Sequence, residues 1–159
     1  MTYLLLAIAL LAEQDRVITP IGEFSNVYYT AEHEYGYTVQ LWQDGETVIG
    51  MFFYSGGLQG DAPRGVLENV EYNPRTGQLS FRAKLSIGMT NGNQWSKDLF
   101  EFSGQLSQKN VAGALRGPFA TEHVDLKKRQ PPGFMSPTRS YLEWKHQADE
   151  VLKLLRPKW

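Results

Sequence analysis

Short segments in which apolar and polar residues alternate follow one another through most of the chain. Eight such segments lie between residues 22 and 126, separated by turn signals rich in Gly, Asn, Asp and Pro. No helical pattern interrupts them, so the strands are expected to pair antiparallel with their sequence neighbours. Eight strands are enough for a sheet to close on itself. The pattern predicts an all-β fold, an eight-stranded antiparallel meander barrel. Its strands are expected at residues 22–31, 37–42, 47–54, 66–72, 79–85, 99–106, 111–116 and 119–126.

One segment after the strands has helical periodicity. Apolar residues recur there at every third or fourth position, Ser136 suits the N-cap, Pro137 suits the first helical position, and Pro157 ends the pattern. We expect this C-terminal α-helix to pack on the outside of the barrel. The chain then divides into a lead-in at residues 1–21, a barrel at 22–126, and a linker with the helix at 127–159.

The Asp44-Gly45 dipeptide is the strongest turn signal and predicts a two-residue type I′ hairpin loop. This register places Tyr37 opposite Phe52, on a face that is apolar throughout and is expected to line the interior. The opposite face of the returning strand is apolar too, at Ile49, Met51 and Phe53. A strand that is apolar on both faces is buried on both. The helix is the expected cover for the outer face.

The interior of the barrel is the first candidate site. Four aromatic side chains are predicted to point into it: Tyr37, Phe52, Phe81 and Phe102. Such an interior either is filled by side chains or holds one small ligand, and concave apolar sites are typical of ligand binding. The Gly-rich segment Ser55–Gly65 is expected to form a long loop that acts as a lid.

Glu68 is predicted to be the polar anchor of this site. It lies in the inward row formed by Val66, Val70 and Tyr72, and a buried carboxylate is often a ligand contact or a proton-transfer group. The alternative is a bulge or a strand edge that lets Glu68 reach solvent.

Other site chemistry has little support in the sequence. Glu32-His33-Glu34 and Glu122-His123-Val124-Asp125 become neighbours if the barrel closes, but adjacent strand residues point apart and no metal-ligand spacing occurs. We predict a solvated polar rim there, with no metal site and no cofactor. No nucleophile elbow or phosphate loop occurs, and the absence of Cys excludes disulfides and thiol chemistry.

Charge is divided unevenly along a nearly neutral chain. The net charge of −1 gives no electrostatic case for nucleic acid. Residues 1–126 carry 8 Lys and Arg against 14 Asp and Glu, a balance of −6, whereas residues 127–159 carry 8 against 3, a balance of +5. The basic tail is expected to dock on its own acidic barrel. Contact with a membrane surface or an anionic partner is the alternative.

The N-terminal run Tyr3–Ala12 has the length of the apolar part of an export signal and is too short to span a bilayer. We expect no integral membrane span and an exported protein, secreted or periplasmic. A helix packed on the barrel of a cytoplasmic protein is the alternative.

Gly22-Glu23-Phe24 opens the first strand where lipocalins and avidins have Gly-x-Trp, and Asn26 extends the likeness to the avidin pattern Gly-x-Trp-x-Asn. The meander and the helix after its last strand are similar to lipocalins. The chain therefore resembles the calycin superfamily, although Phe24 replaces the Trp. The resemblance implies a small-molecule cup and no particular ligand.

The leading functional hypothesis is non-catalytic binding of a small apolar or aromatic molecule in the barrel lumen. One alternative is an interaction module with a filled core, in which the Gly-rich loop and two tryptophans, Trp95 and Trp159, contact a protein or polymer. The other is an enzyme that uses Glu68 or His123 as a general base. The sequence does not predict the oligomeric state.

Overall fold

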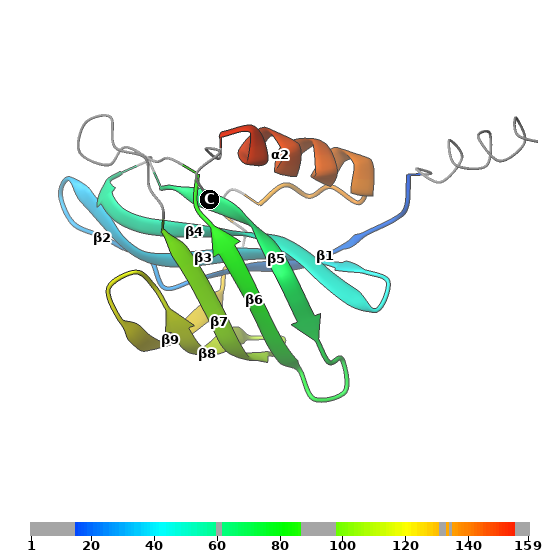
Figure 1. Ribbon diagram of the computed structural model, residues 1–159, viewed down its shortest axis with the longest axis horizontal. Helices are drawn as coiled ribbons and strands as arrows, with labels where there is room; N and C mark the ends of the chain where they lie inside the picture. The colour runs from blue at the N-terminus through cyan, green and yellow to red at the C-terminus, as the bar shows by residue number, and fades with distance from the viewer. Residues whose placement is uncertain (1–14, 60–61, 87–97, 131–132, 134, 155–159) are drawn as a thin grey trace, which may run out of the picture.

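The computed structural model describes residues 15–59, 62–86, 98–130, 133 and 135–154. In this part of the chain, nine strands precede one helix (Figure 1). The strands are β1 (Thr19–Ser25), β2 (Tyr28–Tyr29), β3 (His33–Asp44), β4 (Thr47–Leu58), β5 (Arg64–Tyr72), β6 (Gln78–Lys84), β7 (Leu99–Leu106), β8 (Asn110–Arg116) and β9 (Thr121–Lys128), and the helix is α2 (Tyr141–Leu154). The predicted export segment Tyr3–Ala12 lies outside the described residues. The strand predicted at 99–106 begins at Leu99 as expected.

The strands form a closed antiparallel meander barrel. Each strand from β3 to β9 pairs with its sequence neighbour, and β1 pairs with both β3 and β9 to close the barrel. This confirms the predicted fold class, an eight-stranded barrel with one C-terminal helix, and adds the short strand β2. The predicted first strand is split because the Asn26 side-chain oxygen accepts the Tyr37 N–H at 2.7 Å, which interrupts the regular pairing with β3.

The β3–β4 hairpin turns one residue later than predicted. Its loop is Gly45-Glu46, and Asp44 pairs with Thr47. Only the first loop residue has a positive φ, 62° at Gly45, which is typical of a type II′ turn rather than type I′. Tyr37 therefore lies opposite Tyr54, not Phe52. The partner shifts by two residues, an even number, so the predicted inner and outer faces are retained.

The predicted loop Ser55–Gly65 is mostly strand. β4 continues to Leu58 and β5 begins at Arg64. Gly56 and Gly57 pair with Tyr35 and Glu34 of β3, so the glycines extend the hairpin instead of interrupting it. The predicted loop, and with it the lid, is therefore wrong in extent, because the ladder between β3 and β4 includes residues 55–58.

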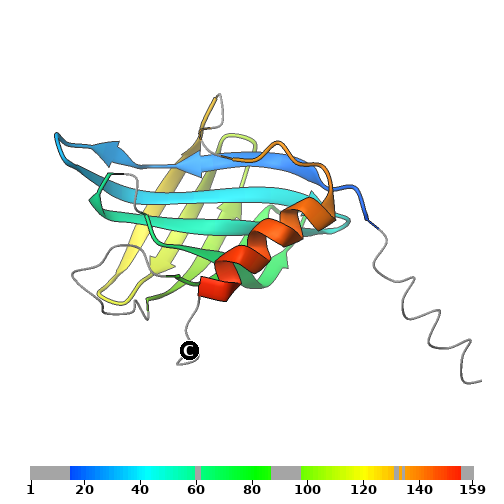
Figure 2. The same cartoon turned by 90° about the horizontal axis from the view of Figure 1, so that it is seen from above.

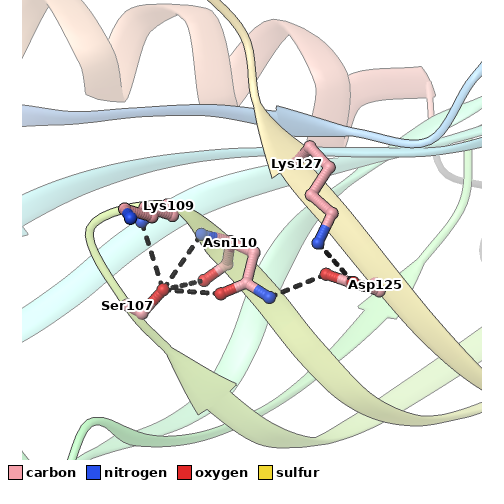
Figure 3. A network of polar contacts seen from close by, with 5 residues as sticks. All are labelled: Ser107, Lys109, Asn110, Asp125 and Lys127. Atoms are coloured by element: carbon pink, nitrogen blue, oxygen red, sulfur yellow. Dashed lines mark hydrogen bonds and ion pairs between the residues drawn. The ribbon is translucent and has the colours of Figure 1, made fainter.

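The β7–β8 hairpin has the predicted register, with Leu106 opposite Val111. Its turn is held by Ser107, whose hydroxyl accepts the backbone N–H groups of Lys109 at 3.1 Å and Asn110 at 3.0 Å. Figure 3 shows this network, which continues through the Asn110 amide to Asp125 on β9 and from there to Lys127. These side chains satisfy one another and tie the turn to the neighbouring strand.

Two apolar clusters stabilise the molecule. The larger fills the barrel and includes Phe24, Val39, Phe52, Phe81 and Phe102. The smaller joins the outside of the sheet to the helix. Its buried members are Ile18, Trp42, Met51, Trp144, Ala148 and Val151, with Ile49 and Phe53 packed against them. The predicted role of the helix as the cover of the outer face is confirmed.

The helix begins later than predicted. α2 starts at Tyr141, and its N-cap is Ser140 rather than Ser136, because the Ser140 Oγ accepts the Glu143 N–H at 3.2 Å. Residues 136–140 instead run beside the lead-in, where Val17 forms a bridge with Ser140. No helix among the described residues has the length and apolarity needed to cross a membrane.

Candidate functional site

The outer face of β1, β3, β4 and β5 has an apolar part and a polar part. The helix covers the apolar part, where Trp42, Met51 and Val66 lie. Figure 2 shows that α2 lies over one end of these strands and leaves the end near β2 uncovered. The outward residues at that end are mostly polar, beginning with Thr38 and Glu34 on β3. The candidate site lies on this uncovered polar part.

A cavity of about 370 Å³ lies here, outside the barrel. We call it the outer groove, and its lining residues are Glu23, Val27, Tyr29, Glu34, Thr38, Gln40, Phe53, Ser55, Ala62, Arg64 and Arg129. Side chains alternate across a strand, which explains why Thr38 and Phe53 line the groove while Val39 and Phe52 line the interior. Its volume is within the range of small-molecule sites.

Glu23 lies in the floor of the groove and is only 1% exposed. Its Oε2 accepts a hydrogen bond from Gln40 Nε2 at 3.0 Å, and its Oε1 accepts the Gly133 N–H at 3.0 Å. The Arg129 guanidinium lies 3.4 Å from the same Oε1. The buried carboxylate is therefore balanced by a cation and by two neutral donors.

Glu34 is the second buried carboxylate of the groove, 7% exposed. Its Oε1 accepts the Ser55 hydroxyl at 3.2 Å. Within the described part of the chain, no Lys, Arg or His forms an ion pair with it. A Cβ placed on its cross-strand neighbour Gly57 would meet no atom within 4 Å, so the space beside Glu34 is open.

Aromatic and basic side chains form the remaining walls. Tyr29 pairs with Glu34 across β2 and β3, and Phe53 lies opposite Arg64 in the β4–β5 ladder. Arg64 is exposed at the rim. The groove thus combines buried acceptors, apolar ring surface and an exposed cation, a combination that suits a small molecule with both polar and apolar parts.

The four aromatic residues predicted for the lumen do lie together inside the barrel. Tyr37 is 5.8 Å from Phe52, Phe52 is 6.0 Å from Phe81, and Phe81 is 5.1 Å from Phe102, measured between ring centroids. These rings pack against one another and belong to the apolar cluster inside the barrel. Their proposed role in ligand binding stays a prediction, and their packing favours the alternative of a filled core.

Glu68 does not point into the barrel, which corrects the predicted inward orientation. Leu67, one residue earlier, is buried inside, whereas Glu68 lies opposite Arg82 on the outer face and forms a 3.5 Å ion pair with Lys84. The cause is the bulge that was the alternative interpretation. It lies between Glu68 and Glu71, where Asn69 has a φ of 51°.

One end of the barrel carries a hydrogen-bonded tyrosine. The Tyr37 hydroxyl donates to Glu122 of β9 at 2.5 Å. Burial and this bond to a carboxylate raise the pKa of Tyr37 well above that of an ordinary tyrosine. Burial also raises the pKa of Tyr54, with smaller contributions from Asp98 and Glu122. Both phenols are protonated at neutral pH, as ordinary tyrosines are, and the raised pKa values keep them protonated at higher pH.

The two predicted acidic and histidine segments do not meet. His33 stacks on Tyr35 at 6.1 Å at the far end of β3, whereas Glu122 and His123 lie on β9 near Tyr37 and β8. No group of three or more His, Asp or Glu side chains that could hold a metal ion occurs in the described residues.

The outer groove was not predicted from the sequence. One signal was present: the outward positions of β3 change from polar at Glu34, Thr38 and Gln40 to apolar at Trp42. That change marks the point on the outer face where the helix stops covering the sheet. The other wall residues come from distant parts of the chain, so only the fold brings them together.

No family model, curated protein or solved structure matches the chain.

Proposed function

We propose that the protein binds a small molecule without transforming it, and that the site is the outer groove rather than the lumen. The observation that carries this proposal is the cavity with two buried carboxylates, Glu23 and Glu34, in its walls. Buried polar groups that converge on a concave site are typical of ligand binding. The predicted lumen ligand has less support, because the interior rings contact one another.

The proposal includes a calycin-like origin for the barrel. Its support is the Gly22-Glu23-Phe24 motif, whose side chains lie on opposite faces of the sheet. Phe24 is fully buried inside the barrel, and Glu23 lies in the floor of the groove. Export of the binder through the Tyr3–Ala12 segment stays a prediction from the sequence alone.

Fragment binding followed by NMR tests the location of the site. A library of small aromatic amines, alcohols and acids is added to the ¹⁵N-labelled full chain. We expect the bound fragments to shift the amide signals of Thr38, Ser55 and Arg64. Shifts centred on Phe81 and Phe102 would instead support the lumen, and the groove would be rejected.

Adjacent residues provide a matched pair of variants. Phe53 lines the groove and Phe52 packs inside, although they are neighbours in β4. Phe53→Ala removes ring contact with a groove ligand and should weaken fragment binding about tenfold. Phe52→Leu keeps the core apolar and should leave groove binding unchanged. The reverse pattern would contradict the proposal.

An interaction module is the second candidate function, favoured by the filled interior and by exposed tyrosines at the end near β2. Tyr28 is 61% exposed, and its ring is tilted against that of Tyr35 with 5.5 Å between the ring centroids. Exposed aromatic side chains are enriched where proteins bind partners. If no fragment binds the groove in the NMR experiment, this function is preferred. Trp95 and Trp159, predicted for the same role, lie outside the described residues.

A further inference from the structure

We propose that the ligand of the outer groove is a small organic amine whose ammonium group binds Glu34 and whose apolar part contacts Phe53 and Tyr29. This inference rests on the proposed function, because it names the chemical class of the ligand for the same site. It follows from three features of the groove: a carboxylate with a single protein donor among the described residues, the charge balance of the walls, and aromatic surface beside the carboxylate.

The first feature is the hydrogen-bonding capacity of Glu34. An ionised carboxylate accepts up to about four hydrogen bonds through its two oxygens. In the described part of the chain, Ser55 is its one donor and reaches only Oε1. The other oxygen is not one of the described buried atoms that lack a partner, so it is accessible from the cavity that the Glu34 side chain lines. A ligand with several N–H donors is the natural complement, and an ammonium group provides three.

The second feature is the charge balance. Arg129 lies within 3.4 Å of Glu23 and compensates it, whereas no described cation pairs with Glu34. A buried carboxylate without a counter-charge is costly, and a bound cation would remove that cost. Arg64 is exposed at the rim, so solvent and salt screen its charge more strongly than they screen Glu34. A cation is therefore favoured over an anion.

The third feature is the aromatic surface. Tyr29 lies directly across the β2–β3 ladder from Glu34, so its side chain starts beside the carboxylate on the same face. Phe53 lines the same cavity from β4. Aromatic faces attract ammonium groups and also bury hydrocarbon. Rings next to a carboxylate therefore suit an amine better than a polyol or an acid.

Three probes of almost the same shape test this class: 2-phenylethylamine, 2-phenylethanol and 3-phenylpropionate. At pH 7 they are a cation, a neutral molecule and an anion. Dissociation constants are measured by NMR titration of the full chain, following the amide signals of Thr38 and Ser55. We expect the amine to bind at least about tenfold more tightly than the alcohol, because a charged hydrogen bond is lost in the alcohol. The acid should bind most weakly.

Glu34→Gln keeps the shape and the acceptor for Ser55 but removes the charge. We expect it to weaken binding of the amine about tenfold or more and to leave the alcohol unchanged. Glu68→Gln is the matched control, since Glu68 lies on the outer face of β5 and does not line the groove. It should not alter binding of any probe.

The outcomes separate this inference from the proposed function. If the acid or the alcohol shifts the groove signals at least as strongly as the amine, the groove binds ligands but the amine class is wrong. If Glu34→Gln leaves the affinity for the amine unchanged, Glu34 is not the contact and the inference fails. If none of the three probes shifts the groove signals, both the inference and the groove as a site for molecules of this kind are overturned.

Discussion

At the scale of single residues, Asn69 decides which side of the barrel a carboxylate occupies. It is the one described residue other than glycine with a positive φ, 51°, and it lies in the bulge of β5. The extra residue reverses the alternation of side chains, so Glu68 faces outward. Asn tolerates this left-handed conformation better than most residues.

We predict that Asn69→Val lowers the free energy of unfolding by about 1–2 kcal/mol, because a β-branched residue is strained at this φ. Asn69→Gly, the control, should change it by less than about 0.5 kcal/mol, since Gly adopts positive φ readily. Urea unfolding of both variants measures the difference. Equal stability of the Val variant and the wild type would show that the bulge does not constrain this residue.

Glu34 and Glu68 also show that the local register decides where a carboxylate lies. Both are glutamates in strands, and the sequence pattern singled out Glu68 as the inward one. In the structure Glu68 is paired with Lys84 on the outer face, while Glu34 is buried in the groove wall. The alternation of apolar residues indicates a face only where the register is regular. The bulge between Glu68 and the β5–β6 turn is enough to reverse the face predicted for Glu68.

At the scale of elements, the first turn of the helix is fixed to the lead-in that precedes β1. The Ser140 hydroxyl accepts the Glu143 N–H and lies within 2.8 Å of both Asp15 carboxylate oxygens. Asp15 also accepts the Leu142 N–H at 3.1 Å. The hydroxyl of Ser140 and this N–H lower the pKa of Asp15. One serine therefore caps the helix and joins it to the lead-in.

Replacing that serine tests the cap. Ser140→Ala should lower the free energy of unfolding by about 1–2 kcal/mol, because it removes both the N-cap and the bond to Asp15. Ser136→Ala provides the control, since Ser136 is the N-cap that the sequence predicted, and it should change stability by less than about 0.5 kcal/mol. Guanidinium unfolding followed by tryptophan fluorescence compares them. A larger effect at Ser136 would place the start of the helix there.

At the scale of the whole molecule, closure of the barrel joins residues that are far apart in sequence. β1 pairs with β9 through Phe24 and Lys128, and the Tyr37 hydroxyl of β3 bonds to Glu122 of β9. The bond to Glu122 and the burial of the ring both favour the protonated phenol. Ionisation of this tyrosine should therefore act against the folded state.

We predict that the free energy of unfolding falls as the pH rises above about 10. An unfolded tyrosine ionises near that pH, whereas the raised pKa of Tyr37 keeps it protonated in the fold. Above pH 10 the unfolded state then binds fewer protons than the folded state, so stability decreases with pH.

Urea unfolding between pH 8 and pH 11 checks this dependence. Tyr37→Phe removes the titrating group and should make the decline shallower. Tyr28→Phe, at an exposed position of β2, is the control. If the wild type and Tyr37→Phe lose stability in parallel, Tyr37 does not couple ionisation to folding.

The sequence alone determined the strands, their antiparallel order, the barrel and the helix that covers one outer face. These follow from local periodicity and turn residues, which act over a few neighbouring positions. The predicted pairing register is correct where the alternation of apolar and polar residues is uninterrupted, as at Leu106 and Val111 of the β7–β8 hairpin.

The tertiary structure alone decided the site. The groove needs Glu23 of β1, Glu34 of β3, Arg64 of β5 and Arg129 after β9 on one surface, and only closure of the barrel places them there. The extent of the helix decides which part of the outer face stays open, and a single bulge decides where Glu68 points. These are consequences of long-range packing, which local periodicity does not encode.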